Sequence, residues 1–329
     1  MSDKLLACAK DLPNRQVGSF NSCTGAVEWD NFNYTPHFWI GVVFIVLFSL
    51  TSIAHLVQGI RSKQWYLLCT VFVCALGELI GWAGRTWANK GATWIEGEGG
   101  FWHIPKNAFI MQIVVLIISP AFLAAGWYIL LGRLLKILGP QFCRFNPLTY
   151  AIIFVTGDLA SLIVQAVGGA RASAAKTLDK ANTGAHIMLA GIAIQLVVMT
   201  LFVALLTEFV WRYFTDRPVK PFRFKGTKSA VSVESGSVPT DVERKANLLI
   251  LAMAISTFFV YIRSVYRIIE LAGGWNGSVI DNESLFCGLD GLMVFLALLA
   301  LNIVHPMTFL PKHLTGSGAT EKSTAQETV

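Results

Sequence analysis

Seven long runs of apolar residues follow one another along the chain, separated by segments that carry most of the polar and charged positions. Each run approaches or exceeds the roughly 20 residues that a helix needs to cross a bilayer. The pattern predicts an all-α integral membrane protein, a bundle of seven transmembrane helices. The spans are expected at about residues 37–60, 65–86, 108–138, 148–170, 185–212, 246–272 and 285–309. Pro120 falls in the middle of the third span, where we expect it to kink the helix.

Composition agrees with a membrane protein and excludes several other classes. The 329 residues are 54% hydrophobic and only 14% charged, whereas a soluble domain carries about 25% charged residues. The net charge of +6 does not indicate nucleic-acid binding, because the basic residues lie between the apolar runs. The six cysteines lack the spacing of a zinc site. No nucleotide-binding loop is present, so we expect no cofactor and no ATP hydrolysis within this chain.

Lysine and arginine are more frequent in alternate connecting segments, and this favours an N-terminus outside and a C-terminus in the cytoplasm. We therefore expect an extracellular segment over 1–35, a membrane domain over 36–310, a basic cytoplasmic loop over 213–245 and a disordered cytoplasmic tail over 311–329. Residues on the predicted outside include candidates for covalent modification. They are Cys8 and Cys23 for a disulfide, and Asn33, Asn276 and Asn282 for glycosylation.

The first half of the predicted cytoplasmic loop is strongly basic. Each lysine or arginine beside an anionic leaflet adds about 1 kcal/mol to membrane attraction. Two interpretations stay open, an ordinary solvated loop and a contact with anionic inner-leaflet lipid. The residues that would make this contact are Arg217, Lys220, Arg223, Lys225 and Lys228.

Ionisable side chains inside the predicted spans are the most informative feature of the sequence. A charge at the bilayer centre costs about 2.5–3.5 kcal/mol on insertion scales. Arg263, Arg267 and Glu270 share one helix face, so that face must contact other polar helices or a water-filled cavity. Polar residues of other spans fall in the same outer half. The candidate substrate-binding residues are Glu78, Arg85, Gln112, Asp158, Gln165, His186, Gln195, Arg263, Arg267, Glu270 and Asp290.

Two interpretations of these buried charges are open. The charges could pair only with one another and fix the bundle, since buried ion pairs often serve structural specificity. They could also surround an outward-opening cavity and bind a ligand. Four carboxylates against three arginines leave one spare negative charge, which favours a cationic or zwitterionic ligand. The carboxylates are Glu78, Asp158, Glu270 and Asp290, and the arginines are Arg85, Arg263 and Arg267.

Two further residue types have structural interpretations. Glycines recur in the fourth span, including Gly157, Gly168 and Gly169, and predict close contact with a neighbouring helix. Most tryptophans, Trp275 among them, lie near span ends, as is typical of interfacial anchors.

Several segments together resemble a known family. They are E-L-I-G-W-A-G-R at Glu78–Arg85, Q-I-V-V-L-I-I-S-P-A from Gln112, F-V-T-G-D-L-A-S-L-I-V-Q-A-V-G-G at Phe154–Gly169 and I-R-S-V-Y-R-I-I-E at Ile262–Glu270. Over residues 36–310 the chain resembles the fungal RTA-like proteins, the lipid-translocating exporter family of seven-span membrane proteins. Trp82 departs from the tyrosine or phenylalanine expected in that family, which we expect to alter the shape of the site rather than the fold.

This resemblance implies a transporter or translocase of amphipathic lipids, notably sphingoid long-chain bases, in the plasma membrane, with a link to resistance against amphipathic toxins. A long-chain base is a cationic amine on an alkyl tail, which fits the spare carboxylate. Glu78, Asp158 and Asp290 would then bind the head group, while Arg263 and Arg267 set their charge. The alternatives are a transporter of porphyrin or sterol-like compounds, and a lipid receptor or sensor that signals through the basic loop.

An intramembrane enzyme is not expected. A zinc hydrolase needs several histidines at one depth, whereas His37, His55, His186 and His305 are spread over both sides of the membrane. A retinal protein needs a lysine in the last span, which has none. The expected partners are membrane lipids and an amphipathic small molecule, and no nucleic acid.

Overall fold

The structure is a computed structural model that describes residues 36–95, 101–103, 105–138, 147–175, 178–215, 217, 240–275 and 277–305. Several residues singled out above lie outside the described residues, so the structure does not bear on them. They are the cysteines Cys8 and Cys23, the sequon residues Asn33 and Asn276, the basic residues Lys220, Arg223, Lys225 and Lys228, and the tail from 311 to 329.

The described residues contain seven helical segments that are long and apolar enough to cross a membrane, which confirms the predicted all-α seven-helix membrane protein. Five spans are single helices, and the second and seventh are composite. The single helices of the first, third, fourth, fifth and sixth spans are α2 (Phe38–Ser62), α5 (Lys106–Leu138), α6 (Pro147–Ala174), α7 (Leu178–Phe214) and α8 (Thr240–Ala272). The second span joins α3 (Trp65–Leu67), η1 (Leu68–Phe72) and α4 (Val73–Lys90). The seventh joins α9 (Glu283–Phe286), η3 (Cys287–Gly291) and α10 (Leu292–Ile303).

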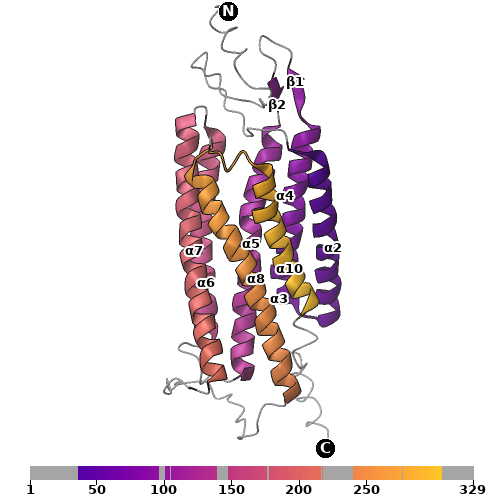
Figure 1. The fold of residues 1–329 in the computed structure, drawn as a ribbon, viewed down its shortest axis with the longest axis vertical. Coiled ribbons are helices and arrows are strands. Elements are labelled where there is room, and N and C mark those ends of the chain that lie inside the picture. Colours follow the sequence, from indigo (N-terminus) through magenta and orange to yellow (C-terminus); the bar gives the residue numbers. More distant parts are fainter. Residues whose placement is uncertain are drawn as a thin grey trace, which may run out of the picture.

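The helices pack as a bundle in which neighbours along the chain are neighbours in space (Figure 1). Each helix in the order α2, α4, α5, α6, α7, α8 and α10 contacts the next one, and α10 also contacts α2. A contact between α5 and α8 crosses the bundle. Strands β1 (Thr93–Ile95) and β2 (Phe101–His103) pair antiparallel, with Trp94 opposite Trp102. We call the end of the bundle that carries these strands and the α8–α9 connection the upper end.

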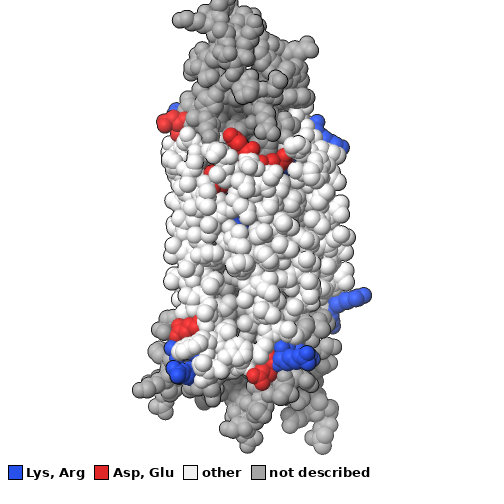
Figure 2. Space-filling model, in the orientation of Figure 1, with Lys and Arg blue, Asp and Glu red and all other residues white. Residues whose placement is uncertain are grey.

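The outside of the bundle is the surface expected of a protein in lipid. On the face shown in Figure 2, charged residues gather toward the two ends and an uncharged band lies between them. Large apolar side chains are exposed along the helices, for example Leu50 on α2, Ile163 on α6 and Val197 on α7. Exposing this apolar surface to water would be unfavourable in free energy, whereas exposing it to the hydrocarbon of a bilayer would not.

Three helix ends differ most from the predicted span ends, two in polar sequence and one before a proline. Helix α7 begins at Leu178 rather than near 185, because the polar residues that precede the apolar run continue the helix above it. Helix α8 likewise begins at Thr240 rather than near 246. Helix α10 ends at Ile303 rather than near 309, and Pro306 follows three residues later, where a helix would lose a hydrogen bond.

Glycines bring α6 and α7 into backbone contact, as the fourth-span glycines predicted. A Cβ atom on Gly168 would lie 2.5 Å from the Met188 nitrogen, and one on Gly184 would lie 2.5 Å from the Ala172 nitrogen. Gly169 is different, since its nearest neighbour would be the Met188 sulfur at 3.8 Å. The close approach therefore depends on Gly168 and Gly184, and Gly169 is not needed for it.

Candidate functional site

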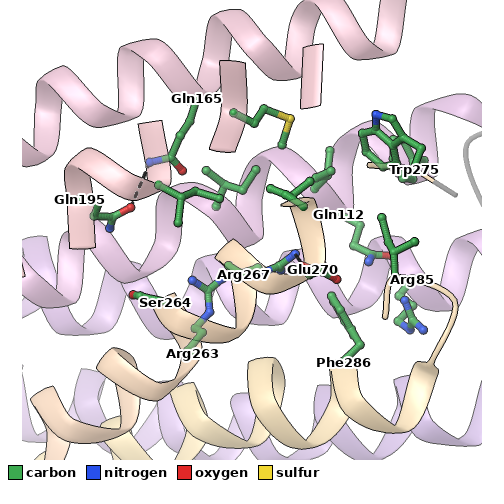
Figure 3. A pocket seen from close by; sticks show the side chains of 17 residues that line it. Arg85, Gln112, Gln165, Gln195, Arg263, Ser264, Arg267, Glu270, Trp275 and Phe286 are labelled. Carbon is green, nitrogen blue, oxygen red and sulfur yellow. Dashed lines mark hydrogen bonds and ion pairs between the residues drawn. The ribbon is translucent and has the colours of Figure 1, made fainter. Parts of the chain in front are cut away.

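A cavity of about 70 Å³ lies inside the upper half of the bundle, between α4, α5, α6, α7, α8 and α9 (Figure 3). A buried water needs about 10–15 Å³ measured in this way, so the cavity has room for a few waters and not for a lipid tail. Its polar wall contains most of the residues predicted from the sequence. They are Arg85, Gln112, Gln165, Gln195, Arg263, Arg267 and Glu270, with Ser264 beside them.

The centre of the polar wall is an ion-pair network between α8 and the last span. Arg267 donates through Nε and Nη2 to the two oxygens of Asp290, at 2.7 and 2.8 Å, and through Nη1 to Glu270 at 2.9 Å. Arg263 Nε lies 2.8 Å from Asp290 Oδ1 as an ion pair without hydrogen-bond geometry. Tyr266 donates its hydroxyl to Glu270 at 3.2 Å. Asp290 is 0% exposed, so a single carboxylate holds both arginines away from lipid.

A proline on α5 provides the second anchor for Arg263. Helix α5 continues through Pro120, and a proline has no N–H to donate to the carbonyl four residues before it. That carbonyl belongs to Leu116, and Arg263 Nη2 donates to it at 2.7 Å. The proline expected from the sequence only to bend the helix therefore also frees an acceptor for a buried guanidinium.

Asp290 is placed by a local change of helix type. It lies in η3, a π-helical turn between α9 and α10, and such turns often occur at functional sites. Gly291 follows it, where a Cβ atom would lie 2.3 Å from the Trp82 ring. Trp82 is fully buried and stacks on Phe44, with ring centroids 3.9 Å apart. The tryptophan that departs from the family pattern thus packs between helices and does not line the cavity.

A second ion pair closes the network at the upper end. Arg85 on α4 donates through Nη2 to Glu283 on α9 at 2.8 Å. Glu283 also accepts from the backbone N–H of His37 at 3.0 Å and pairs with the His37 ring, so it joins the start of α2 to α4. Phe286 lies between two guanidinium groups, with its centroid 4.7 Å from Arg85 Cζ and 5.1 Å from Arg267 Cζ.

Amide side chains form a further part of the cavity wall. Gln165 on α6 donates to Gln195 on α7 at 3.0 Å, as Figure 3 shows. Gln112 on α5 is buried, and its Oε1 has no hydrogen-bond partner among the described residues. These amides can donate to or accept from the hydroxyl or amide groups of a ligand. Apolar side chains complete the wall, among them Phe109, Ile113, Met188, Ile192 and Phe286.

Four predicted site residues lie outside the cavity wall. Asp290 lies behind it and contacts both arginines. Glu78 is 0% exposed, and neither of its carboxyl oxygens has a hydrogen-bond partner among the described residues. Asp158 lies apart from the network and accepts a hydrogen bond from Tyr128 at 2.8 Å. His186 is exposed on α7, because the helix turns that position away from the bundle. His186 is therefore not part of this site.

Some residues of the site were not expected to belong to it. Glu283, which lies just before the predicted seventh span and was not among the candidate residues, is the partner of Arg85. Trp275 was interpreted as an interfacial anchor, but it is buried, donates to the Ala181 carbonyl at 3.1 Å and lines the cavity. A sequence signal for Glu283 exists, since it precedes Asp290 by seven residues and so shares its helix face.

Two predicted modification or lipid-contact residues fall within the described residues. Asn282 is exposed, and its side-chain oxygen accepts from the backbone N–H groups of Ser284 and Leu285 as the N-cap of α9. Arg217 is exposed, with its guanidinium carbon 5.6 Å from the Trp211 ring centroid. Their glycosylation and lipid contact stay predictions.

The opposite end of the bundle contains a smaller cavity of about 10 Å³, lined in part by His55 and His305. His55 Nε2 lies 3.3 Å from the Leu298 carbonyl oxygen. Burial lowers the pKa of His305, just beyond the last span, to about 4, so this imidazole is neutral at pH 7. Among the described residues, no three or more His, Cys, Asp and Glu side chains gather as they would around a metal ion.

Comparison with known proteins places this arrangement in context. A model of the RTA1-like protein family matches residues 71–313, which is more than half of the 329 residues. The sphingoid long-chain base transporter RSB1 of Saccharomyces cerevisiae is 29% identical over 312 residues, covering 89% of this chain and 78% of that protein. Protein RTA1 of the same yeast is 26% identical, covering 84% of each chain. The probable lipid transporter atnI of Emericella nidulans is 27% identical, covering 83% of this chain and 66% of that protein. No solved structure matches.

Proposed function

Because the chain belongs to the RTA1-like protein family, we propose that it moves amphipathic lipids of the sphingoid long-chain base class across the plasma membrane. Two of the relatives are named as transporters of such bases or of lipid, which supports lipid transport rather than catalysis. The proposal places the upper end of the bundle outside, as the distribution of basic residues predicted. Extrusion of an amphipathic toxin would follow from the same activity.

The observation that carries the proposal is a polar cavity enclosed by an apolar, membrane-spanning bundle. Its polar wall combines a carboxylate, Glu270, with three amides, a hydroxyl and three arginines that are themselves paired with carboxylates. The head group of a long-chain base carries one amine and two hydroxyls, so the carboxylate would take the amine. The amides of Gln112, Gln165 and Gln195 would take the hydroxyls. A buried polar wall of this kind discriminates strongly against ligands that lack the matching groups.

The arginines would have a positioning role in this proposal. Arg267 binds Glu270 and Asp290 together, so it fixes the direction in which the Glu270 carboxylate points. This differs from the arrangement expected from the sequence, in which Glu78, Asp158 and Asp290 contacted the head group. Both oxygens of Asp290 contact arginines. One oxygen of Asp158 accepts a hydrogen bond from Tyr128. Glu270 replaces them because it is the carboxylate that lines the cavity.

The size of the cavity implies a moving part. A volume of about 70 Å³ cannot hold an 18-carbon chain, since burying a drug-sized ligand takes about 300–1,000 Å³. Loading would therefore separate helices around the apolar wall formed by Ile113, Met188 and Ile192. The head group would stay at the polar wall while the tail lies between helices or in lipid, as an amphipathic molecule permits.

The test is leaflet exchange of a fluorescent sphingoid base in liposomes that contain the purified protein and no partner. We expect wild type to accelerate exchange, and Gln195→Leu to slow it at least tenfold, because the hydroxyl partner is lost from a buried wall. Gln58→Leu is the matched control. Gln58 lies at the lower end and donates to the Asn302 carbonyl, so its loss should leave exchange nearly unchanged.

Two outcomes would contradict the proposal. Folded wild-type protein that accelerates exchange of no amphipathic lipid would favour the receptor or sensor alternative. Equal exchange by the Gln195 and Gln58 variants would remove the cavity from the mechanism.

A further inference from the structure

Glu78 is a buried carboxyl group that forms none of the ion pairs described above. It lies on α4, fully buried, and both of its oxygens lack a hydrogen-bond partner among the described residues. An ionised carboxylate buried without hydrogen bonds is among the most expensive groups in a protein. Buried carboxyls at membrane depth are commonly parts of proton pathways. The position is thus unexplained by packing alone.

The charged groups around the cavity balance one another without Glu78. Arg263 and Arg267 are balanced by Asp290 and Glu270, which contact them directly. Arg85 is balanced by Glu283. Each arginine in the described part of the site is therefore matched by a carboxylate before Glu78 is counted. An ionised Glu78 would give the site one net negative charge, and a protonated Glu78 leaves it neutral.

The charged groups that act on Glu78 are those of the same network. From other elements these are Arg263 and Arg267 on α8 and Asp290 on η3, and Cys74 lies one turn before it on α4. The neighbouring stretches of α2 and α5 contribute no titratable side chain, since α2 has none between His37 and His55 and α5 has none between Lys106 and Tyr128. Arg263 and Arg267 line the cavity and interact electrostatically with Glu78. A change of charge in the cavity therefore changes the electrostatic potential at the Glu78 carboxyl.

We infer that Glu78 is the coupling group of the transporter, protonated when the cavity is empty and ionised when a cationic head group occupies it. The inference rests on the proposed function, because it needs a cationic lipid in the cavity. Binding of one cation releases one proton from the Glu78 carboxyl, so the total charge of the site does not change. Each transport cycle then exchanges one lipid cation for one proton and is electroneutral.

The energetic reason is the low dielectric of the bundle. An extra positive charge in a site that is already neutral would be costly there, and a carboxylate formed nearby offsets it. Linkage makes the effect reciprocal, so the proton and the cation weaken each other's binding by the same factor. A proton gradient would thereby drive the lipid in the opposite direction, without a nucleotide-binding site.

The first measurement is the number of protons released when a long-chain base binds the purified protein in weakly buffered solution at pH 7. The probe is an N,N,N-trimethyl long-chain base, whose charge is permanent, so every released proton comes from the protein. We expect about one proton per bound lipid for wild type and none for Glu78→Gln. Asp158→Asn is the matched control, a second buried carboxyl within the membrane, and should release the proton as wild type does.

The second measurement is lipid exchange in liposomes with a pH gradient. Wild type should accumulate the trimethyl base on the side of higher proton activity, because each proton that moves down its gradient is exchanged for one lipid cation that moves the opposite way. A membrane potential alone should have no effect. Glu78→Gln should exchange lipid without responding to the gradient. Glu78→Leu serves as a second neutral variant if the glutamine variant does not fold.

The outcomes separate this inference from the proposed function. Wild type that exchanges lipid but releases no proton keeps the function and overturns the coupling. The coupling is also overturned if Glu78→Gln releases as many protons as wild type, or if Asp158→Asn abolishes the release. Failure of the trimethyl base to bind where the primary amine binds would also overturn the coupling, because the site would then recognise N–H donors and not the charge that is inferred to ionise Glu78. Wild type that neither binds nor exchanges long-chain bases overturns both.

Discussion

Asp290→Asn tests the ion-pair network most severely. The substitution nearly preserves volume but replaces the carboxylate that contacts Arg263 and Arg267 at 2.7–2.8 Å. Glu270 would then be the one carboxylate of this network left to balance Arg263 and Arg267. Because position 290 is 0% exposed, the surplus positive charge would stay buried next to it. Removing one partner of a buried ion pair costs about 3–5 kcal/mol. The folding equilibrium should therefore fall by roughly two to almost four powers of ten.

The assay is equilibrium unfolding in mixed micelles, followed by circular dichroism. The matched control is Glu208→Gln, which removes a carboxylate from a partly exposed pair, where Glu208 Oε1 lies 2.8 Å from Arg212 Nη2. A pair of that kind contributes about 0–1 kcal/mol. A double variant, Asp290→Asn with Arg263→Gln, should recover part of the loss because it removes the surplus charge.

The reasoning would be refuted by an Asp290→Asn variant that is no less stable than Glu208→Gln. It would also be refuted if the double variant were less stable by the sum of both single losses. In either case the arginines would not depend on Asp290 for their charge balance.

The contact between α6 and α7 yields a matched pair of predictions. Gly168→Ala places a Cβ atom 2.5 Å from the Met188 nitrogen, so the helices must separate, and we expect a loss of about 1–3 kcal/mol in the same unfolding assay. Gly169→Ala has only the Met188 sulfur at 3.8 Å and gains helix propensity, so it should be neutral or stabilising by up to about 1 kcal/mol. Equal losses in both variants would show that the glycines act through propensity and not through close packing.

The sequence predicted the number of helices because hydropathy alone determines which segments can cross a bilayer. It did not predict where the helices end in polar sequence, as at Leu178 and Thr240, since a helix can continue into water with no apolar signal. Arg263, Arg267 and Glu270 line the cavity together, because their spacing puts them on one helix face. Their contact with a substrate stays a prediction.

The partners of these charges could not be predicted in the same way. Depth does not fix how each helix is rotated, so Asp158 was grouped with the arginines although it contacts Tyr128. His186 was included although its side chain is exposed. The contact of Arg263 with the Leu116 carbonyl depends on which helix faces Pro120, and one sequence does not contain that information.

The proposed function requires that the cavity holds the head group of a long-chain base. The most direct measurement is photo-crosslinking of a long-chain base with a diazirine near its amine, followed by mass spectrometry of the labelled peptides. We expect labels on cavity-lining residues such as Met188, Ile192 and Trp275, and competition by unlabelled base. Labels confined to lipid-facing residues such as Leu50, Ile163 and Val197, without competition, would contradict it.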